Sequence, residues 1–403
     1  MSDLLAIAQR NGIALVFRDG RSTFCGFSKV GRENRAFPDE ACRTGTGVEE
    51  VGARDVRSDP HLREIVWEAL TLEPDEGDGE ATGFVEFAMM FGRLDNLTDR
   101  PSVMAKLARA AMRQAFRNHV SYLELKVNPI GRTEATLTGE GWADTPVAIE
   151  EVASLLRQAV EEENRRLVEV WEASPGGAGG WPEGWPAPVE VRFIVGGNRT
   201  RPLREGGLSR MDPIRCEDPA AEVCPSRLRQ AFYLTGISPH AKLFVGIDFV
   251  GLPEVDSPTD EPLGQILTGL TRESGPVNIT LHAGETANPS WRDHVAQALA
   301  AGARRIGHGL NMRASETSLE LFCRAPGTGY LPVSLNTDDA GVFETDLSAE
   351  FLKAVEAFDL TWEEVKRLAR NSLLFSFADA GTRIALLERW EEEVAALEDG
   401  WSW

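Results

Sequence analysis

The sequence predicts an α/β protein built as a parallel (β/α) barrel, and three observations lead to this fold class. Apolar strand patterns alternate with amphipathic helical patterns, as is typical of parallel βα units. Polar clusters follow the strands directly: LKVNP, DFVG, HAGE, GHG and NTDD. The 403 residues are 42% hydrophobic, which is enough apolar material for a large core. Because parallel α/β folds bind ligands at the carboxyl ends of their strands, we expect the clusters to gather there.

The N-terminal part carries a helix, a strand and a long segment without a period. Residues 3–12 have apolar positions at helical spacing, with Asp3 as a candidate N-cap and Gly12 as a stop. IALVF follows as a short strand. Residues 18–60 are polar and charged, and we interpret them as an irregular insertion. A second turn-rich, acidic stretch precedes two helical patterns, FVEFAMMFGRL and SVMAKLARAAMRQAFRNH.

The remaining chain alternates strands with helices and then ends in helices. Strand patterns cover residues 120–127, 189–195, 242–250, 277–283, 304–309 and 331–337. Helical patterns cover residues 147–173, 225–236, 261–274 and 291–303, and the C-terminal ones cover 346–358, 361–377 and 381–398. No GxGxxG opens a helix after a strand and no GxxxxGK[ST] is present, so those nucleotide-binding motifs are excluded.

Charge and cysteine usage limit the partners and the compartment. The net charge of −21 opposes non-specific nucleic-acid binding. No run of 18 apolar residues and no basic region before the first apolar stretch occur, so we expect no membrane span or secretory signal. The five cysteines are odd in number and form no CxxC pair, which predicts neither a disulfide framework nor a thiolate zinc site. We expect a reducing, cytoplasmic setting.

Two histidines at strand ends are candidate functional residues. His282 lies in LHAGE and His308 in RIGHG, and each alone is more often a structural residue. Glu285 and the pair Asp338–Asp339 accompany them, although a turn or helix cap in NTDDAG would also explain the two aspartates. Imidazole and carboxylate ligands suit Zn²⁺, whose bound water ionises near neutral pH. A carboxylate three residues from a ligand histidine could then transfer a proton.

Three motifs in this order resemble the adenosine deaminase family of metal-dependent hydrolases. They are VNITLHAGET, RRIGHGLNM and LPVSLNTDDAGVF, and weaker similarity covers YLELKVNP, KLFVGIDFVGLPE and LARNSLLFSF. LLAIAQRNGI resembles the family's first helix. The resemblance spans residues 83 to 390 and implies a TIM-type (β/α)8 barrel.

The resemblance implies a role for each matching residue. His282 and Asp338 match two ligands of a single Zn²⁺ ion. Glu285 matches the carboxyl group that protonates purine N1, and His308 matches the histidine that orients and activates the metal-bound water. Asp339 matches the aspartate that contacts the water and N7. Gly251 matches a glycine whose backbone amide meets N3. Hydroxide would add to C6 of a purine substrate, and ammonia would leave.

The sequence departs from the family pattern in two places. The family's first strand carries a His-x-His, which this sequence lacks. The most similar segment is LVFRDG, in which Phe17 and Arg18 cannot bind zinc as the two imidazoles do. The 23 residues from His308 to Leu331 leave too little chain for the seventh strand and its helix. The regions of strands 1 and 7 are therefore missing or degenerate. Segments could be absent from this chain, the gene could have lost them, or other strands could fill the barrel around a rebuilt site.

These inferences give one domain plan and two functions. Residues 1–82 form an N-terminal helix plus an irregular insertion, 83–390 the adenosine-deaminase-like barrel, and 391–403 a helix end and tail. The leading hypothesis is zinc-dependent hydrolytic deamination of an aminopurine nucleoside or nucleotide. The alternative is an inactive barrel that binds a purine or serves as an assembly subunit. A different metal hydrolase, such as an amidase, is a third interpretation, against which HAGE and NTDD argue.

Overall fold

The structure is a computed structural model that describes residues 2–10, 13–28, 42, 47–71, 89–94, 97–98, 100–138, 141–174, 186–198, 227–250, 276–285, 294–310 and 332–400. The chain divides into two compact units, and each is described by itself. Unit 1 contains Met1–Gln114, Gly131–Val160 and Asn336–Lys353. Unit 2 contains Ala115–Ile130, Glu161–Leu335 and Ala354–Trp403.

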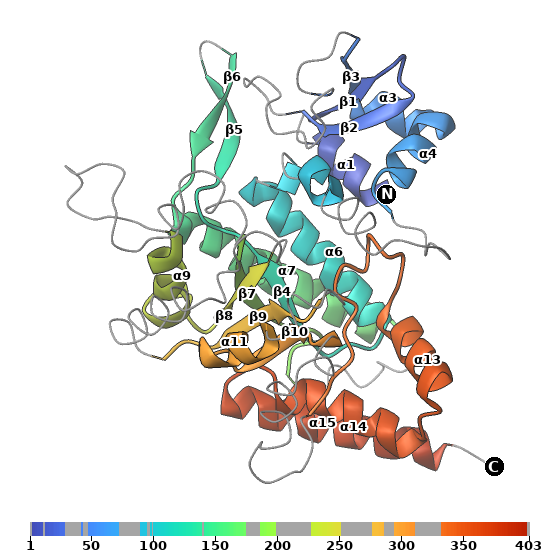
Figure 1. Ribbon diagram of the computed structural model, residues 1–403, viewed down its shortest axis with the longest axis vertical. Helices are drawn as coiled ribbons and strands as arrows, with labels where there is room; N and C mark the ends of the chain where they lie inside the picture. Colours follow the sequence, from blue (N-terminus) through green and yellow to red (C-terminus); the bar gives the residue numbers. More distant parts are fainter. Residues whose placement is uncertain are drawn as a thin grey trace. The chain divides into compact units, whose positions relative to one another are not determined.

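A five-stranded parallel sheet forms the centre of unit 2 (Figure 1). Its strands are β4 (Tyr122–Val127), β7 (Glu190–Asn198), β8 (Phe244–Val250), β9 (Ile279–Ala283) and β10 (Arg305–His308). They lie side by side in chain order, and every neighbouring pair is parallel. This order is that of a partly closed (β/α) barrel, which confirms the predicted fold class.

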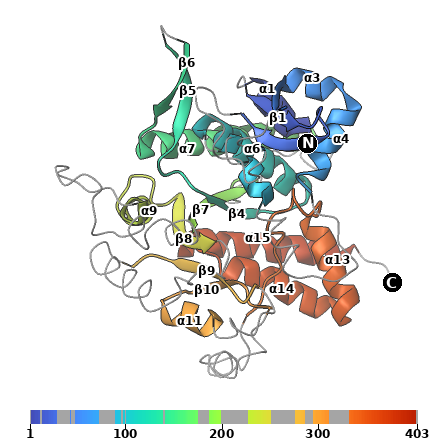
Figure 2. The same cartoon turned by 45° about the horizontal axis from the view of Figure 1, so that its top comes forward.

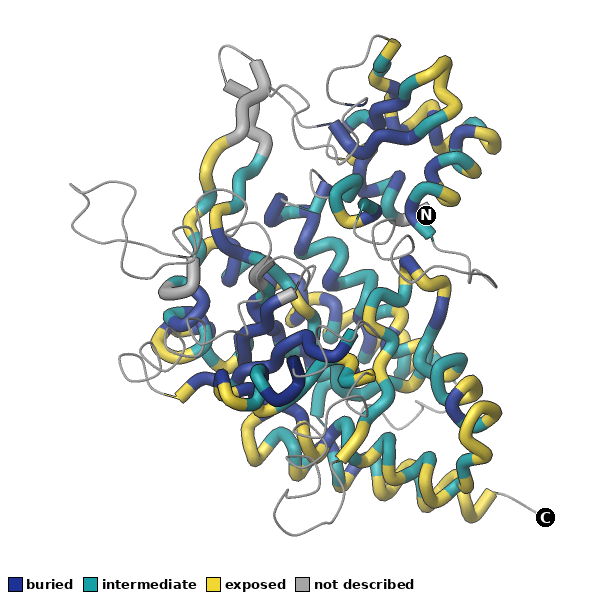
Figure 3. The backbone as a smooth tube through the Cα atoms, in the orientation of Figure 1, coloured by how far each residue is buried: buried dark blue, intermediate teal, exposed yellow. Residues whose placement is uncertain are grey.

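The central strands β7, β8 and β9 are largely buried, as their apolar sequences predict (Figure 3), whereas the outer strands β4 and β10 are half-buried. All five residues of β9 are buried, and the rings of Phe193 and Phe244 lie 5.5 Å apart between β7 and β8. Helices α9 (Arg227–Gly236) and α11 (His294–Ala300) contact β8 and β9. The C-terminal helices α14 (Trp362–Leu374) and α15 (Ala380–Asp399) contact each other (Figure 2).

Three other helices match predicted patterns. They are α6 (Pro101–Arg117), α7 (Ile149–Glu172) and α13 (Leu347–Phe358). The helix predicted at 261–274 lies outside the described residues. No helix among the described ranges is long and apolar enough to cross a membrane.

Unit 1 begins with a small sheet where the sequence analysis expects an irregular insertion. After α1 (Ser2–Arg10), strand β1 (Ala14–Arg18) pairs antiparallel with β2 (Thr23–Phe27) and β3 (Glu49–Gly52). Two helices follow, α3 (Ala53–Ser58) and α4 (Pro60–Glu68). The interpretation of residues 18–60 as irregular is therefore wrong for β2, β3 and α3. Their strands are too short for a sustained pattern, yet they bury a shared core that includes Leu5, Leu15, Phe17, Phe24 and Val56.

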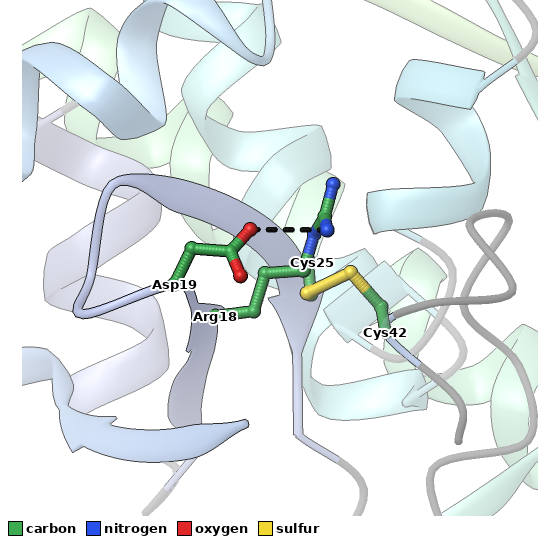
Figure 4. The surroundings of a disulfide bond; sticks show 4 residues. All are labelled: Arg18, Asp19, Cys25 and Cys42. Carbon is green, nitrogen blue, oxygen red and sulfur yellow. Dashed lines mark ion pairs between the residues drawn. A yellow bond between two sulfur atoms is a disulfide. The ribbon is translucent and has the colours of Figure 1, made fainter. Parts of the chain in front are cut away.

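A disulfide joins Cys25 in β2 to Cys42 (Figure 4). Their Cα atoms lie 5.7 Å apart, both residues are buried, and 17 positions separate them in the chain. The expectation of no disulfide is therefore wrong for this pair. Counting cysteines does not show which thiols the fold brings together. The other three cysteines, Cys216, Cys224 and Cys323, lie outside the described residues.

Two further elements differ from the predictions. A hairpin of β5 (Thr133–Thr138) and β6 (Gly141–Pro146) stands where the hydrophobic pattern predicts no element, and Glu134 accepts a hydrogen bond from Ser102 N at 2.9 Å. In contrast, residues 332–337 form no strand. There the Asn371 side chain of α14 donates to Val333 O at 2.9 Å, so this carbonyl bonds to a side chain instead of to a strand.

Candidate active site

Three polar side chains from neighbouring parts of the sheet meet near its carboxyl edge. Lys126 of β4, Asp248 of β8 and His282 of β9 all belong to unit 2. Lys126 Nζ lies 3.0 Å from Asp248 Oδ2 and 3.2 Å from His282 Nε2. His282 Nδ1 lies 3.1 Å from Asp248 Oδ1. The three groups therefore form a closed triangle of polar contacts.

The donors in this triangle determine the tautomer of His282. An ammonium group only donates hydrogen bonds, so His282 Nε2 must accept with its lone pair. The proton of the neutral ring is then on Nδ1, and this N–H donates a hydrogen bond to Asp248. Burial acts to raise the pKa of Asp248, but contacts with His282 and Lys126 outweigh it and hold that pKa below the usual value. Asp248 is thus an ionised carboxylate with only 1% of its side chain exposed.

A second pair lies next to the triangle, where β9 and β10 end. His308 Nε2 is 3.6 Å from Glu285 Oε1, and the His282 and His308 rings are 4.9 Å apart between centroids. Gly284, with φ 70°, allows the left-handed turn that leads from β9 to Glu285. His308 itself has φ 68°, a conformation that non-glycine residues seldom adopt.

Comparisons with known proteins show to which family this chain is similar. The family model described as adenosine deaminase matches residues 314–393. A curated relative named N6-Methyl-AMP deaminase-L from Xenopus laevis is 25% identical over 341 residues, which is 77% of this chain and 82% of the relative. These matches support the adenosine deaminase family of the amidohydrolase superfamily for this chain, and with it a deaminase-like hydrolase.

Two solved structures show the same fold. The adenine deaminase from Arthrobacter aurescens has a TM-score of 0.56 and 16% identity, covering 98% of this chain and 94% of that one. A zinc-bound amidohydrolase from Burkholderia ambifaria has a TM-score of 0.52 and 16% identity, covering 85% and 84%. The TIM-barrel fold of the adenosine deaminase family is therefore the fold of this chain.

Three of the residues expected from the family resemblance come together in unit 2. They are His282, Glu285 and His308. Asp338 and Asp339 belong to unit 1, where Asp338 has φ 47° and the Asp339 carbonyl accepts hydrogen bonds from Val342 N and Phe343 N. The turn that would explain the two aspartates structurally is thus present. A pocket that Asp338 and Asp339 share with His282 stays a prediction. Gly251 lies outside the described residues.

Two members of the cluster, Lys126 and Asp248, are not among the site residues predicted from the sequence. Both lie in the polar clusters LKVNP and DFVG, so the topological signal for them is present in the sequence. Their contacts with His282 could not be seen because they join positions 156 and 34 residues apart in the chain. Only the strand order brings these side chains together.

The zinc ion implied by the adenosine deaminase family does not fit the contacts of the described residues. Within those ranges, no three His, Cys, Asp or Glu side chains form a group that could hold a metal ion. The ligand nitrogen available on His282 is Nε2, and the Lys126 ammonium lies 3.2 Å from it. A cationic donor at that position competes with a metal ion instead of helping to bind it.

Proposed function

We propose that this protein deaminates a 6-aminopurine nucleoside or nucleotide by hydrolysis. In this reaction the exocyclic amine leaves from C6 and an oxygen atom from water takes its place. The observation that carries the proposal is the pairing of Glu285 with His308 beside His282, at the ends of β9 and β10. The match to the adenosine deaminase family model and the names of the relatives support it.

The proposed chemistry needs an acid for the ring and a group that orients water. Glu285 would donate a proton to ring nitrogen N1 as oxygen adds to the neighbouring C6, which neutralises the charge building on the ring. His308, 3.6 Å from that carboxyl group, would orient the attacking water. We propose that Asp339 contacts N7 and that the Gly251 amide meets N3. Asp338 would be a second protein ligand only if a zinc ion replaced Lys126 at His282.

The substrate is proposed as a purine that carries an amino or methylamino group at C6. The relatives are named as N6-methyl-AMP deaminases and the fold neighbour as an adenine deaminase, so base, nucleoside and nucleotide all belong in the assay. We propose a cytoplasmic enzyme, in which setting the Cys25–Cys42 pair would meet reducing conditions.

Release of ammonia or methylamine from a panel of 6-aminopurines tests the proposal. The panel contains adenine, adenosine, AMP and N6-methyl-AMP, each assayed with and without added Zn²⁺. Glu285→Gln removes the acid and should lower turnover by about two to four powers of ten while keeping the fold. Glu356→Gln is the matched control, because Glu356 is exposed on α13 of the same unit, and it should leave turnover unchanged.

Two results would contradict the proposal in different ways. Wild-type turnover in Glu285→Gln would remove the assigned role of Glu285. A wild-type protein that turns over none of the purines, yet binds one of them, would favour the inactive purine-binding barrel. The contact between Lys126 and His282 favours this alternative, since it leaves the ligand nitrogen of His282 occupied.

A further inference from the structure

We propose that the Lys126 ammonium holds the position on His282 Nε2 that a metal ion would need, so that Lys126 and a divalent cation compete for this nitrogen. Competition at His282 in unit 2 does not require that the protein deaminates anything, so it would still hold if the proposed function failed.

His282 has one lone pair to offer, and the structure assigns it to Lys126. Nδ1 is engaged with Asp248 at 3.1 Å, which leaves Nε2 as the nitrogen for any further partner. Lys126 Nζ lies 3.2 Å from Nε2. A Zn–N bond is about 2.0–2.1 Å long, so an ion on the same lone pair would lie less than about 3 Å from Nζ. Two cations cannot share that space.

The charges around His282 favour the lysine in the absence of an ion. Asp248 is ionised, has 1% of its side chain exposed, and pairs with Lys126 Nζ at 3.0 Å. A buried carboxylate needs such a partner, and the Lys126 ammonium supplies it. A bound metal would displace the ammonium, and Asp248 would then keep only its hydrogen bond with His282, the orienting contact typical of a metal-ligating histidine.

Exchange between the two states needs the movement of a single side chain. Lys126 has 38% of its side chain exposed, whereas His282 and Asp248 have 9% and 1%. The lysine can therefore turn toward solvent while the histidine and the aspartate stay in place. Lys126 is thus a built-in competitor for the metal position and not a ligand.

Zinc affinity of a series of variants tests this proposal. Dissociation constants are measured by competition with a chromophoric chelator, using zinc alone and the full chain. Lys126→Met keeps the length of the side chain without its charge and should bind zinc at least about tenfold more tightly than wild type. Lys242→Met is the matched control, since Lys242 is exposed just before β8, and it should bind zinc like wild type. Lys126→Gln replaces Lys126→Met if the latter does not fold.

The His282→Ala change connects the gain to the proposed nitrogen. In the Lys126→Met background it should remove the added zinc affinity and return the protein to the wild-type value. An unchanged zinc affinity in Lys126→Met would overturn the proposal. A gain that survives His282→Ala would also overturn it, because the ion would then bind elsewhere.

Discussion

Strand β4 carries residues with two different roles. Tyr122 and Glu124, near its start, stabilise the fold, and Lys126, near its end, belongs to the candidate site. Tyr122 and Glu124 lie four and two positions before Lys126, so the alternation of the strand places all three on the same face. Glu124 accepts hydrogen bonds from the Tyr122 hydroxyl at 2.7 Å and from Phe377 N at 2.7 Å, and pairs with Arg305 at 2.5 Å. Burial first, and then the charge of Glu124, raise the pKa of Tyr122 far above its usual value.

Replacing Glu124 should therefore destabilise the barrel. Glu124→Ala leaves Arg305 without its ion pair and Phe377 N without an acceptor, while 11% of the Glu124 side chain is exposed. We expect a loss of about 2–4 kcal/mol in the free energy of unfolding, measured in urea. Glu391→Ala is the control, because its ion pair with Arg370 is exposed on both sides. An equal, small effect of both changes would show that the Glu124 network is dispensable.

At the level of elements, the C-terminal helices are defined by caps that are visible in the sequence. Thr361 caps α14 by accepting a hydrogen bond from Glu364 N, and the Glu364 carboxylate accepts one from Thr361 N. Asp379 caps α15 by accepting from Thr382 N at 3.0 Å. Hydrogen bonds from the Thr382 hydroxyl and backbone lower the pKa of Asp379. Both caps satisfy backbone donors that the first helical turn leaves open.

The Asp379 cap should give α15 a pH-dependent stability. Because its pKa is lowered in the folded state, the contribution is complete above about pH 4 and is lost as the pH falls through the lowered value. At pH 7, Asp379→Ala should cost about 1 kcal/mol. Thermal unfolding from pH 7 to pH 3 should show this difference shrinking at the acid end. Asp379→Asn is the control: it keeps a capping oxygen without a charge, and its stability should not follow that titration.

Elements whose hydrophobic pattern extends over many residues could be predicted from the sequence, and short elements could not. The helices α7, α14 and α15 and the strands β4, β8 and β9 lie where their patterns place them. The strands β2 and β3 have five and four residues, and β5 and β6 have polar sequences, so none carries a clear period. Their pairing depends on tertiary contacts such as the core of Phe17 and Phe24.

The candidate site was predictable in its residue types but not in its contacts. His282, Glu285 and His308 follow from the motifs at two strand ends. Lys126 is not predicted because a lysine within a strand has no fixed role until its partner is known. The motifs indicate two zinc ligands, but the cation next to one of them is seen only in the geometry of β4 and β9.

At the scale of the whole molecule, the two compact units do not follow the domain plan along the chain. Unit 1 combines the N-terminal part with Gly131–Val160 and Asn336–Lys353, and so takes Asp338 and Asp339. The cluster around His282 belongs to unit 2. The domain of 83–390 stays a proposal, and so does a pocket that joins Asp338 to His282. The net charge of −21, in contrast, is a property of the whole chain and does not depend on how the units are divided.

Because of this net charge, kcat/KM for nucleotide substrates should depend on salt concentration, whereas kcat/KM for nucleosides should not. A protein of charge −21 repels an anionic phosphate over a range that shortens as ionic strength rises. We therefore expect kcat/KM for AMP or N6-methyl-AMP to rise between low salt and about 0.2 M NaCl, by about twofold to tenfold. Adenosine has no charge to screen, and its kcat/KM should stay constant, which makes it the internal control. A fall of kcat/KM for the nucleotides alone would mean that a local positive field attracts the phosphate despite the net charge, and would identify a nucleotide as the substrate this site is built to bind.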